Sequence, residues 1–262
     1  MVSTSVDNLG LLCHGFPNLR RMLRFFRKIR QSLLQSGQTT KYVKYALGEI
    51  VLVVIGILIA LQINNWNEKR ILERKELTLL REMKSNLQED LIDLDFNIAG
   101  TEMRLNSSEI ILKVINQKLP DHDSLRQHFG KFMGSYQLTN NTAAFDNLSS
   151  IGFDLVRNDS LRMSITRLYS NRYAYLRSLE MDTQGTFVLD QLMPTYRAVF
   201  TTEVFWESAQ PNDFEAICSN GTFREQLVFH IFIFKYMHRI YSDIKAEVEA
   251  LREQIRKEVE GR

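Results

Sequence analysis

Cysteine is scarce in this sequence, and so are the residues that interrupt helices. The two cysteines, Cys13 and Cys218, lie far apart and form no Cys-x-x-Cys pair. We expect no internal disulfide, and Cys218 is expected to be a lone buried thiol; the alternative is a link between two copies in an oxidising compartment. Only four prolines and twelve glycines occur in a chain rich in Leu, Glu, Arg and Lys. This composition favours helix throughout.

Acidic residues are nearly missing from the first quarter of the chain. Only Asp7 and Glu49 precede residue 64, whereas every charged residue from Arg20 to Lys44 is basic. Residues 64–262 carry a slight acidic excess instead. Charge segregated in this way indicates a basic segment beside a membrane, followed by an ordinary soluble domain. It argues against a nucleic-acid partner.

The sequence also lacks the motifs that carry familiar chemistry. It has no Gly-rich phosphate loop and no His-Glu-x-x-His pattern. Within the pairs His122/His128 and His230/His238, the spacing does not place both rings on one helical face, so they are expected in caps, core and surface. Neighbouring carboxylates such as Glu89 and Asp93 are interpreted as a solvated helix face. We therefore expect no metal, no cofactor and no enzyme.

One apolar run stands out against this background. Residues 46–63 would span about 27 Å as a helix, close to the thickness of a bilayer's hydrocarbon core. Tyr42 and Tyr45 before it and Trp66 after it are typical interfacial anchors. Its uninterrupted core, residues 50–61, is short enough for a signal peptide. The long basic region before it, with no small-x-small cleavage site after it, favours an uncleaved transmembrane helix.

The charges on either side of this run predict its orientation. The basic excess precedes it, and the charges after it roughly balance. The N-terminus is therefore expected in the cytoplasm and residues 64–262 on the other side. Residues 22–45 form the basic juxtamembrane segment, and residues 1–21 are a disordered tail or an over-extended start before Met22.

The basic juxtamembrane segment contains an amphipathic pattern. Within MLRFFRKIRQSLL, apolar residues are spaced along one helical face, which is typical of a helix lying on anionic lipid. Arg24, Arg27, Lys28 and Arg30 would then contact lipid headgroups. A flexible basic tail that only sets the topology is the alternative interpretation.

Three residues within the apolar run suggest helix association. Glu49, Gly56 and Ala60 fall on one face, and Gly56 and Ala60 form a small-x-x-x-small step that permits close helix approach. A carboxyl group inside a span is costly and usually faces protein or water. The alternatives for Glu49 are a shallow position with the carboxylate reaching the headgroups, or a role in handling ions or protons.

The remainder predicts an all-α domain. A long helix is expected from Asn64 to about Leu119 with Gly100 as its hinge, followed by a short helix from an Asp121 cap to Tyr136. The inward positions of the long helix follow near-heptad spacing at Met83, Leu87, Leu91, Leu94, Ile98, Leu105 and Leu112.

Three further helices complete this prediction. The first spans residues 142–151, with a stripe of Phe145, Leu148 and Ile151, and ends at Gly152. The second begins at an Asn158 or Asp159 cap and runs towards Met193 before Pro194. Its inward residues are expected to be Leu161, Ile165, Leu168 and Tyr175.

The last helix spans residues 222–260. Its apolar run, residues 227–234, is too short and too polar for a second span, and is interpreted as a buried bundle helix or a partner-binding surface. The expected architecture is a single transmembrane helix followed by a long-helix antiparallel bundle.

The anchor and its flanks carry a family resemblance. The matching residues are Lys41-Tyr42, Ala46, Gly48-Glu49-Ile50 and the run from Gly56 to Asn67; a second block runs from Phe145-Asp146-Asn147-Leu148 to Asp159-Ser160-Leu161-Arg162. From about Met22 onward, the chain resembles a family of Gram-negative bacterial membrane proteins, domain of unknown function 6090. The resemblance implies a single-pass protein of the inner membrane with a periplasmic helical domain. It implies no activity.

The function expected from these features is that of a membrane-anchored, non-enzymatic interaction or assembly protein. Its expected partners are membrane lipid and either a second copy or another membrane or periplasmic protein. The alternative is a sensor or signalling subunit that relays periplasmic ligand binding through the anchor to a partner. An ion-coupled accessory to a transport motor would rest on Glu49 alone.

Overall fold

The computed structural model describes residues 39–134 and 136–262 and is mostly helical, as predicted. The chain divides into two units, Met1–Ile71 and Leu72–Arg262. Helix α2, Thr39–Gln117, contributes to both. The hydrophobic core lies within the second unit.

The part of α2 in the second unit has one buried face. The predicted heptad positions are confirmed: Leu87 and Leu94 are fully buried, and Ile98, Leu105 and Leu112 pack against the core at its edge. A sustained apolar seam of this kind needs partner helices to cover it.

Gly100 is not the hinge that the sequence predicted, since α2 continues through it to Gln117. A Cβ atom at Gly100 would lie 2.1 Å from Cζ of Tyr136. The glycine therefore allows an aromatic ring to lie against the helix backbone. A glycine in a helix costs about 1 kcal/mol relative to alanine, and this contact gives it a packing role.

A long connection follows α2. It contains α3, Leu125–Lys131, α4, Ala143–Ile151, and the 3₁₀ turn η2, Phe153–Leu155. The short helix predicted from Asp121 to Tyr136 is wrong at both ends, because α3 begins after Ser124 and no side chain caps it. Helix α4 does end at Gly152, which has a φ of 118°. Ile151, expected in the inward stripe, is exposed.

Helical backbone then runs from Asp159 to Val199, with wider π-helical turns inside it. In order, the segments are α5 (Asp159–Thr166), η3 (Arg167–Arg172), α6 (Tyr173–Ser178), η4 (Leu179–Gly185), η5 (Phe187–Leu192) and α7 (Met193–Val199). The side chain of Asn158 caps α5 by accepting a hydrogen bond from the Leu161 N–H. Pro194 does not end the helix, because it lies in the first turn of α7, where its missing N–H is tolerated.

The π turn η3 explains why the prediction for Tyr175 is wrong. Leu161, Ile165 and Leu168 are buried as expected. A π turn places extra residues in each turn and rotates the side chains that follow it. Tyr173 and not Tyr175 therefore points inward, while the Tyr175 hydroxyl lies 2.5 Å from that of Tyr236.

A small hairpin and two helices complete the chain. Strands β1, Phe200–Val204, and β2, Ser208–Pro211, pair antiparallel with Phe200 opposite Pro211, and a bulge interrupts the register between Thr202 and Val204. Helix α8, Phe214–Ser219, precedes α9, Gly221–Glu260. The predicted final helix is confirmed.

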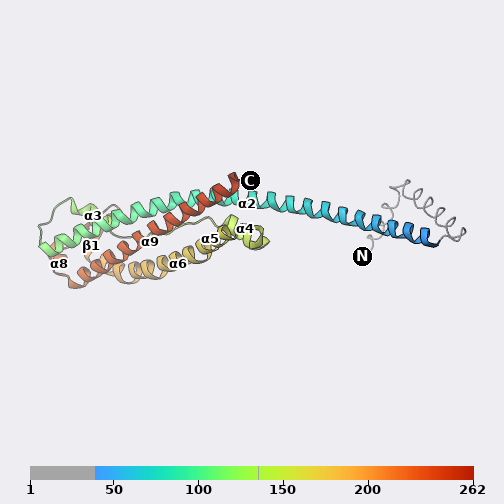
Figure 1. The fold of residues 1–262 in the computed structure, drawn as a ribbon. Helices are drawn as coiled ribbons and strands as arrows, with labels where there is room; N and C mark the ends of the chain where they lie inside the picture. The colour runs from blue at the N-terminus through green and yellow to red at the C-terminus, as the bar shows by residue number, and fades with distance from the viewer. Residues whose placement is uncertain (1–38, 135) are drawn as a thin grey trace, which may run out of the picture. The chain divides into compact units, whose positions relative to one another are not determined.

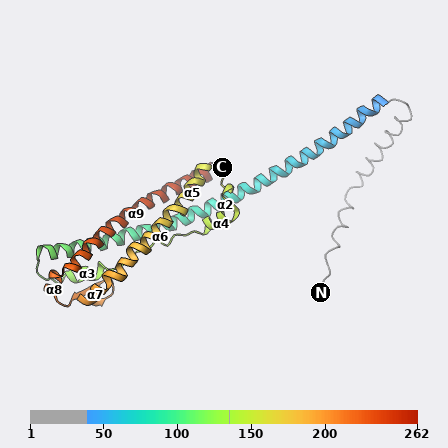
Figure 2. The same cartoon turned by 90° about the horizontal axis from the view of Figure 1, so that it is seen from below.

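Cross-helix contacts give the directions of the three long helical segments. Asp95 of α2 pairs with Lys245 of α9, and Glu109 pairs with Lys235, both at 2.7 Å. Helix α9 is therefore antiparallel to α2. The run from α5 to α7 is parallel to α2, because the connection between them returns along the length of the second unit. Figures 1 and 2 both show α9 beside α2 and beside α5 and α6.

Candidate functional site

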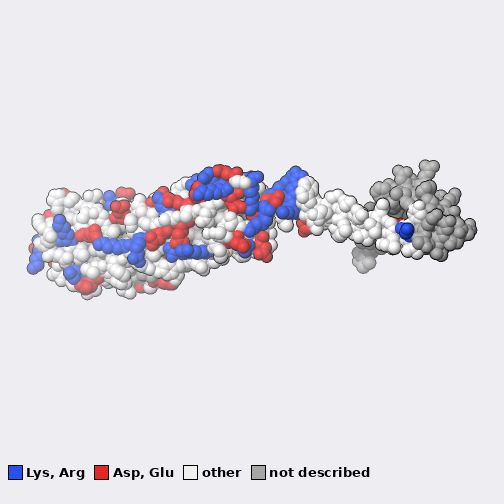
Figure 3. Space-filling view, in the orientation of Figure 1, with Lys and Arg blue, Asp and Glu red and all other residues white. Residues whose placement is uncertain are grey.

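The first unit presents an apolar helical surface. Apolar side chains of α2 from Val43 to Ile63 are about half to two-thirds exposed, as for Leu52 at 66% and Leu58 at 59%. Among the described residues, one helix, α2, is long and apolar enough to cross a membrane. In Figure 3 this part of α2 is almost free of charged side chains. Such a surface is stable only when lipid or protein covers it.

The predicted interfacial residues lie at the two ends of this surface. Tyr45 and Trp66 are both more than 60% exposed, and the Arg70 guanidinium lies 5.6 Å from the centre of the Trp66 ring. Tyr42 belongs to the same helix. The sequence-predicted lipid contacts, Arg24, Arg27, Lys28 and Arg30, lie outside the described residues.

The predicted association face is on α2. Glu49 is half-buried, whereas Gly56 and Ala60 are exposed. A Cβ atom at Gly56 would meet nothing within 4 Å. The space beside Gly56 is therefore open to an approaching helix, and helix association through this face stays a prediction.

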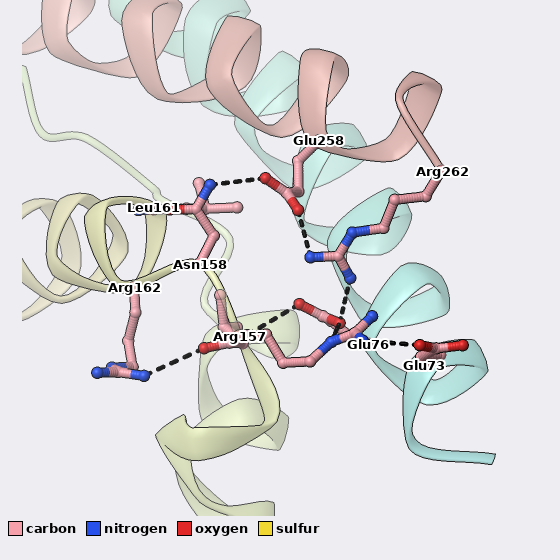
Figure 4. A network of polar contacts seen from close by, with 9 residues as sticks. Glu73, Glu76, Arg157, Asn158, Leu161, Arg162, Glu258 and Arg262 are labelled. Atoms are coloured by element: carbon pink, nitrogen blue, oxygen red, sulfur yellow. Dashed lines mark hydrogen bonds and ion pairs between the residues drawn. The ribbon is translucent and has the colours of Figure 1, made fainter. Parts of the chain in front are cut away.

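A cluster of ionic side chains joins three segments in the second unit (Figure 4). This polar clamp consists of Glu73 and Glu76 from α2, Arg157 and Asn158 from the connection before α5, and Glu258 and Arg262 from the end of α9 and beyond it. An open cavity of about 570 Å³ lies against it and is lined partly by Arg157 and Arg262. The two guanidinium groups thus keep contact with solvent.

Glu76 is the centre of the polar clamp. Its carboxylate accepts hydrogen bonds from the Arg157 backbone N–H at 3.0 Å, from Arg157 Nε at 2.9 Å and from Arg262 at 2.5 Å. Its side chain is 1% exposed, whereas those of Arg157 and Arg262 are 40% and 25% exposed. A buried carboxylate of this kind must be fully hydrogen-bonded to be tolerated.

The environment of Glu76 lowers its pKa. Burial alone would raise the pKa, but the hydrogen bonds from the Arg157 N–H and from the Arg262 and Arg157 side chains together outweigh burial. The carboxylate therefore remains ionised at neutral pH. Its contribution to stability is lost as the pH falls through this lowered pKa.

Carboxylates also hold an extended segment against the helices. Residues 136–141, here called the strap, donate backbone hydrogen bonds from Leu138 to Glu180, from Thr139 to Asp93 and from Asn141 to Asp90. These distances are 2.7–2.8 Å. Glu89 is exposed and Asp93 is partly exposed, as expected for a solvated face, and both also bind the strap: Asp93 accepts from the Thr139 backbone N–H, and Glu89 accepts from the Asn141 side chain.

Two of the strap's carboxylates are buried beside tyrosines. Asp90 accepts from the Tyr173 hydroxyl at 2.6 Å, and Glu180 accepts from the Tyr241 hydroxyl at 2.8 Å. Burial raises the pKa of both carboxyls, and the hydrogen bonds that they accept oppose this change only in part. Burial also raises the pKa of both tyrosines.

The Glu180→Gln variant is expected to reveal this cost of burial. A carboxyl whose pKa is raised on folding stabilises most when protonated, and that stability is lost as the pH rises through the folded-state pKa. We therefore compare the free energies of unfolding of the variant and of wild type. The difference, variant minus wild type, should increase by about 1 kcal/mol between pH 4 and pH 8. Urea unfolding of the detergent-solubilised chain, followed by circular dichroism, measures it; a pH-independent difference would contradict this account.

Other buried polar groups lie where the C-terminal part of α2 meets α3 and α9. His230 is fully buried, with Nδ1 3.2 Å from the Ser108 hydroxyl, and burial followed by the nearby Arg104 charge lowers its pKa to about 3. The Arg104 side chain donates to the Lys131 carbonyl at 2.9 Å and lies between the rings of Tyr136 and Trp206. His230 is thus a neutral core residue.

The structure also shows the surroundings of the predicted cap before α3, of two histidines and of Cys218. Ser124, not Asp121, precedes α3, and its hydroxyl lies 2.8 Å from Nδ1 of His122. Nδ1 of His128 lies 3.2 Å from the Ser107 hydroxyl. Cys218 is a free, half-buried thiol. Among the described residues, no three His, Cys, Asp or Glu side chains are grouped as metal ligands.

The sequence did give a signal for the polar clamp and the buried carboxylates, although sequence reasoning missed them. Glu76 precedes the buried Leu80 and Met83 by four and seven residues, and Asp90 follows Met83 by seven. Both are acids on the inward face of a heptad pattern. A charge at such a position indicates a buried polar contact.

The fold and these sites define a mostly helical protein. Among the residues that the structure describes, α2 is the helix long and apolar enough to cross a membrane, and buried carboxylates tie together the helices of the second unit. Residues 49–183 match the family of unknown function (DUF6090), and the chain belongs to this family. The match includes Glu76, Arg157 and both strap carboxylates with raised pKa. No curated protein and no solved structure matches the chain.

Proposed function

We propose that the protein is a single-pass component of a bacterial inner membrane whose helical second unit binds other proteins in the periplasm. The exposed apolar face of α2 between Val43 and Ile63 carries this proposal, because a run of this length and exposure matches the hydrocarbon core of a bilayer. The basic excess before residue 46 supports a cytoplasmic N-terminus.

The contacts of the polar groups in the second unit support a non-enzymatic role. Glu76, Asp90, Asp93 and Glu180 each accept hydrogen bonds that tie the connection to the long helices. Their carboxylates are occupied by structural donors. We infer that they preserve the shape of a binding unit.

The anchor is tested by placing charge in it. Arginine at both Val54 and Leu58, one helical turn apart, should release the chain from membranes during alkaline carbonate extraction, while wild type stays in the pellet. Each arginine costs about 2.5–3.5 kcal/mol at the centre of a span. Ile71→Arg is the matched control, since Ile71 is also exposed but follows Trp66, and it should remain in the pellet. Carbonate release of wild type would refute the anchor.

A further inference from the structure

Helix α2 carries a second apolar seam that faces away from the core. Ile92 and Phe96 are each 64% exposed, Met103 is 43% exposed, and Ala99 is also exposed. These four residues, the outer stripe, follow each other at intervals of four, three and four. This is the a/d spacing of a helix that packs against another helix. Ile110, one heptad further along, is half-buried and packs against the core, so the outer stripe ends at Met103.

Contacts with the strap and with the core hold the outer stripe in position. The Phe96 ring lies edge-on to Tyr136 of the strap, with ring centres 5.6 Å apart. Tyr136 itself fits against Gly100. The buried residues Leu91 and Leu94 fix the same turn of α2 in the core. A preorganised surface of this kind loses little conformational entropy on binding.

Acidic side chains border the outer stripe on both sides. Asp95, Glu102 and Glu109 recur every seven residues along one edge, and Glu89 and Asp93 lie on the other. Lys245 and Lys235 of α9 pair with Asp95 and Glu109, so Glu102 lies between two bridged acids. A second copy would bring the same acidic edges to this surface, whereas a helix with basic edges would bring the opposite charge. Like charges facing each other across such a seam oppose pairing.

We propose that the outer stripe binds an amphipathic helix of another protein whose apolar seam is flanked by lysine or arginine. This inference rests on the proposed function and gives the chemistry of the partner. The apolar a/d residues would insert between Ile92 and Met103, and the basic flanks would reach Glu102 on one edge and Glu89 on the other. It is a helix-on-helix mode of recognition.

The test uses the full chain in phosphatidylcholine nanodiscs and labelled synthetic helices of about 20 residues, long enough to cover the outer stripe. One helix carries leucines at a/d positions with lysines on both flanks, a second replaces the lysines by glutamates, and a third scrambles the basic sequence. Fluorescence anisotropy, with empty nanodiscs subtracted, should show that the basic amphipathic helix binds most tightly, and more weakly as salt rises.

Variants of two equally exposed phenylalanines decide where the helix binds. Phe96→Arg should lower the affinity at least about tenfold, because it removes the central apolar contact and adds a like charge. Phe232→Arg is the matched control on α9, since Phe232 is 63% exposed, and it should bind like wild type. Glu102→Lys should weaken binding of the basic helix and strengthen binding of the acidic one.

Three results would overturn the inference. They are equal binding of the basic and scrambled helices, equal effects of Phe96→Arg and Phe232→Arg, or a dimer of the chain that Phe96→Arg dissociates. The last would show that a second copy covers the outer stripe. Because each variant is also extracted with carbonate, a binding failure in a chain that stays in the membrane counts against this inference alone. Release of wild type counts against the anchor.

Discussion

Replacing Glu76 by alanine is expected to lower the free energy of unfolding of the second unit by about 3 kcal/mol. The substitution removes a buried acceptor that Arg157 and Arg262 share, and it leaves the Arg157 backbone N–H without its partner. Breaking a buried ion pair from one side costs about 3–5 kcal/mol. The lower end applies here because both guanidinium groups are partly exposed. Urea unfolding of the solubilised chain at neutral pH measures the loss.

Glu73→Ala is the matched control. Glu73 also pairs with Arg157 from α2, at 2.7 Å, but its side chain is 40% exposed. An exposed pair contributes at most about 1 kcal/mol, so the loss should be correspondingly small. The advantage of wild type over Glu76→Ala should also shrink in acid, since the pKa of Glu76 is lowered by folding. Equal losses for the two variants would show that Glu76 is not the centre of the polar clamp.

Gly130→Ala is expected to destabilise the second unit, where α3 contacts the β1–β2 hairpin, by about as much as Glu76→Ala does. A Cβ atom at Gly130 would lie 2.3 Å from the backbone nitrogen of Ser208 and 2.5 Å from the carbonyl carbon of Glu207. Backbone atoms cannot rotate away as a flexible side chain does, so α3 and the hairpin must separate. Overpacking of this kind typically costs about 1–3 kcal/mol, and this contact falls at the upper end.

Helix propensity alone would predict that a Gly→Ala substitution stabilises the protein, whereas the close contact at Gly130 predicts that it destabilises it. Alanine is favoured over glycine within a helix by about 1 kcal/mol, so a site with room would be stabilised. Gly221→Ala is such a site, because a Cβ there would meet nothing within 4 Å. Thermal unfolding should therefore show a lower midpoint for Gly130→Ala and an unchanged or higher one for Gly221→Ala. A stabilised Gly130→Ala would mean that α3 and the hairpin do not touch at this point.

The helices were predictable because their apolar spacing is local information. Met83, Leu87 and Leu94 repeat along α2 and were placed correctly, and the cap of α5 was narrowed to Asn158 or Asp159 from residue type, of which Asn158 is the one that caps. Neither requires knowledge of the partner helices. The apolar run of α2 was equally visible, because consecutive apolar residues can be read directly from the sequence.

The errors share a different origin, since each depends on contacts between distant parts of the chain. Gly100 was taken as a hinge because the sequence does not show that Tyr136 lies against it. Tyr175 was placed inward because an ideal helix was assumed through the π turn η3. The strap carried no strand pattern, since carboxylates and not a neighbouring strand accept its hydrogen bonds.

The residues of the candidate sites also fall into two groups, those predictable from local sequence and those brought together by the tertiary fold. Gly56 and Ala60 were selected from within the apolar run and Tyr45 and Trp66 from its two ends, and the roles predicted for them assume a bilayer around the run. The polar clamp joins residues more than 180 positions apart, as in Glu76 and Arg262. Pairing over such a separation is set by the tertiary fold, which local patterns do not encode.

The most direct test of the central claim is labelling of single cysteines on the two sides of the apolar run. Cys13 and Cys218 are first replaced by serine, and Lys44→Cys or Glu82→Cys is then introduced, both at exposed positions. A membrane-impermeant maleimide is added to cells whose outer membrane has been permeabilised. The account predicts labelling at residue 82 but at residue 44 only after lysis. Labelling of both residues before lysis, or of residue 44 alone, would contradict it.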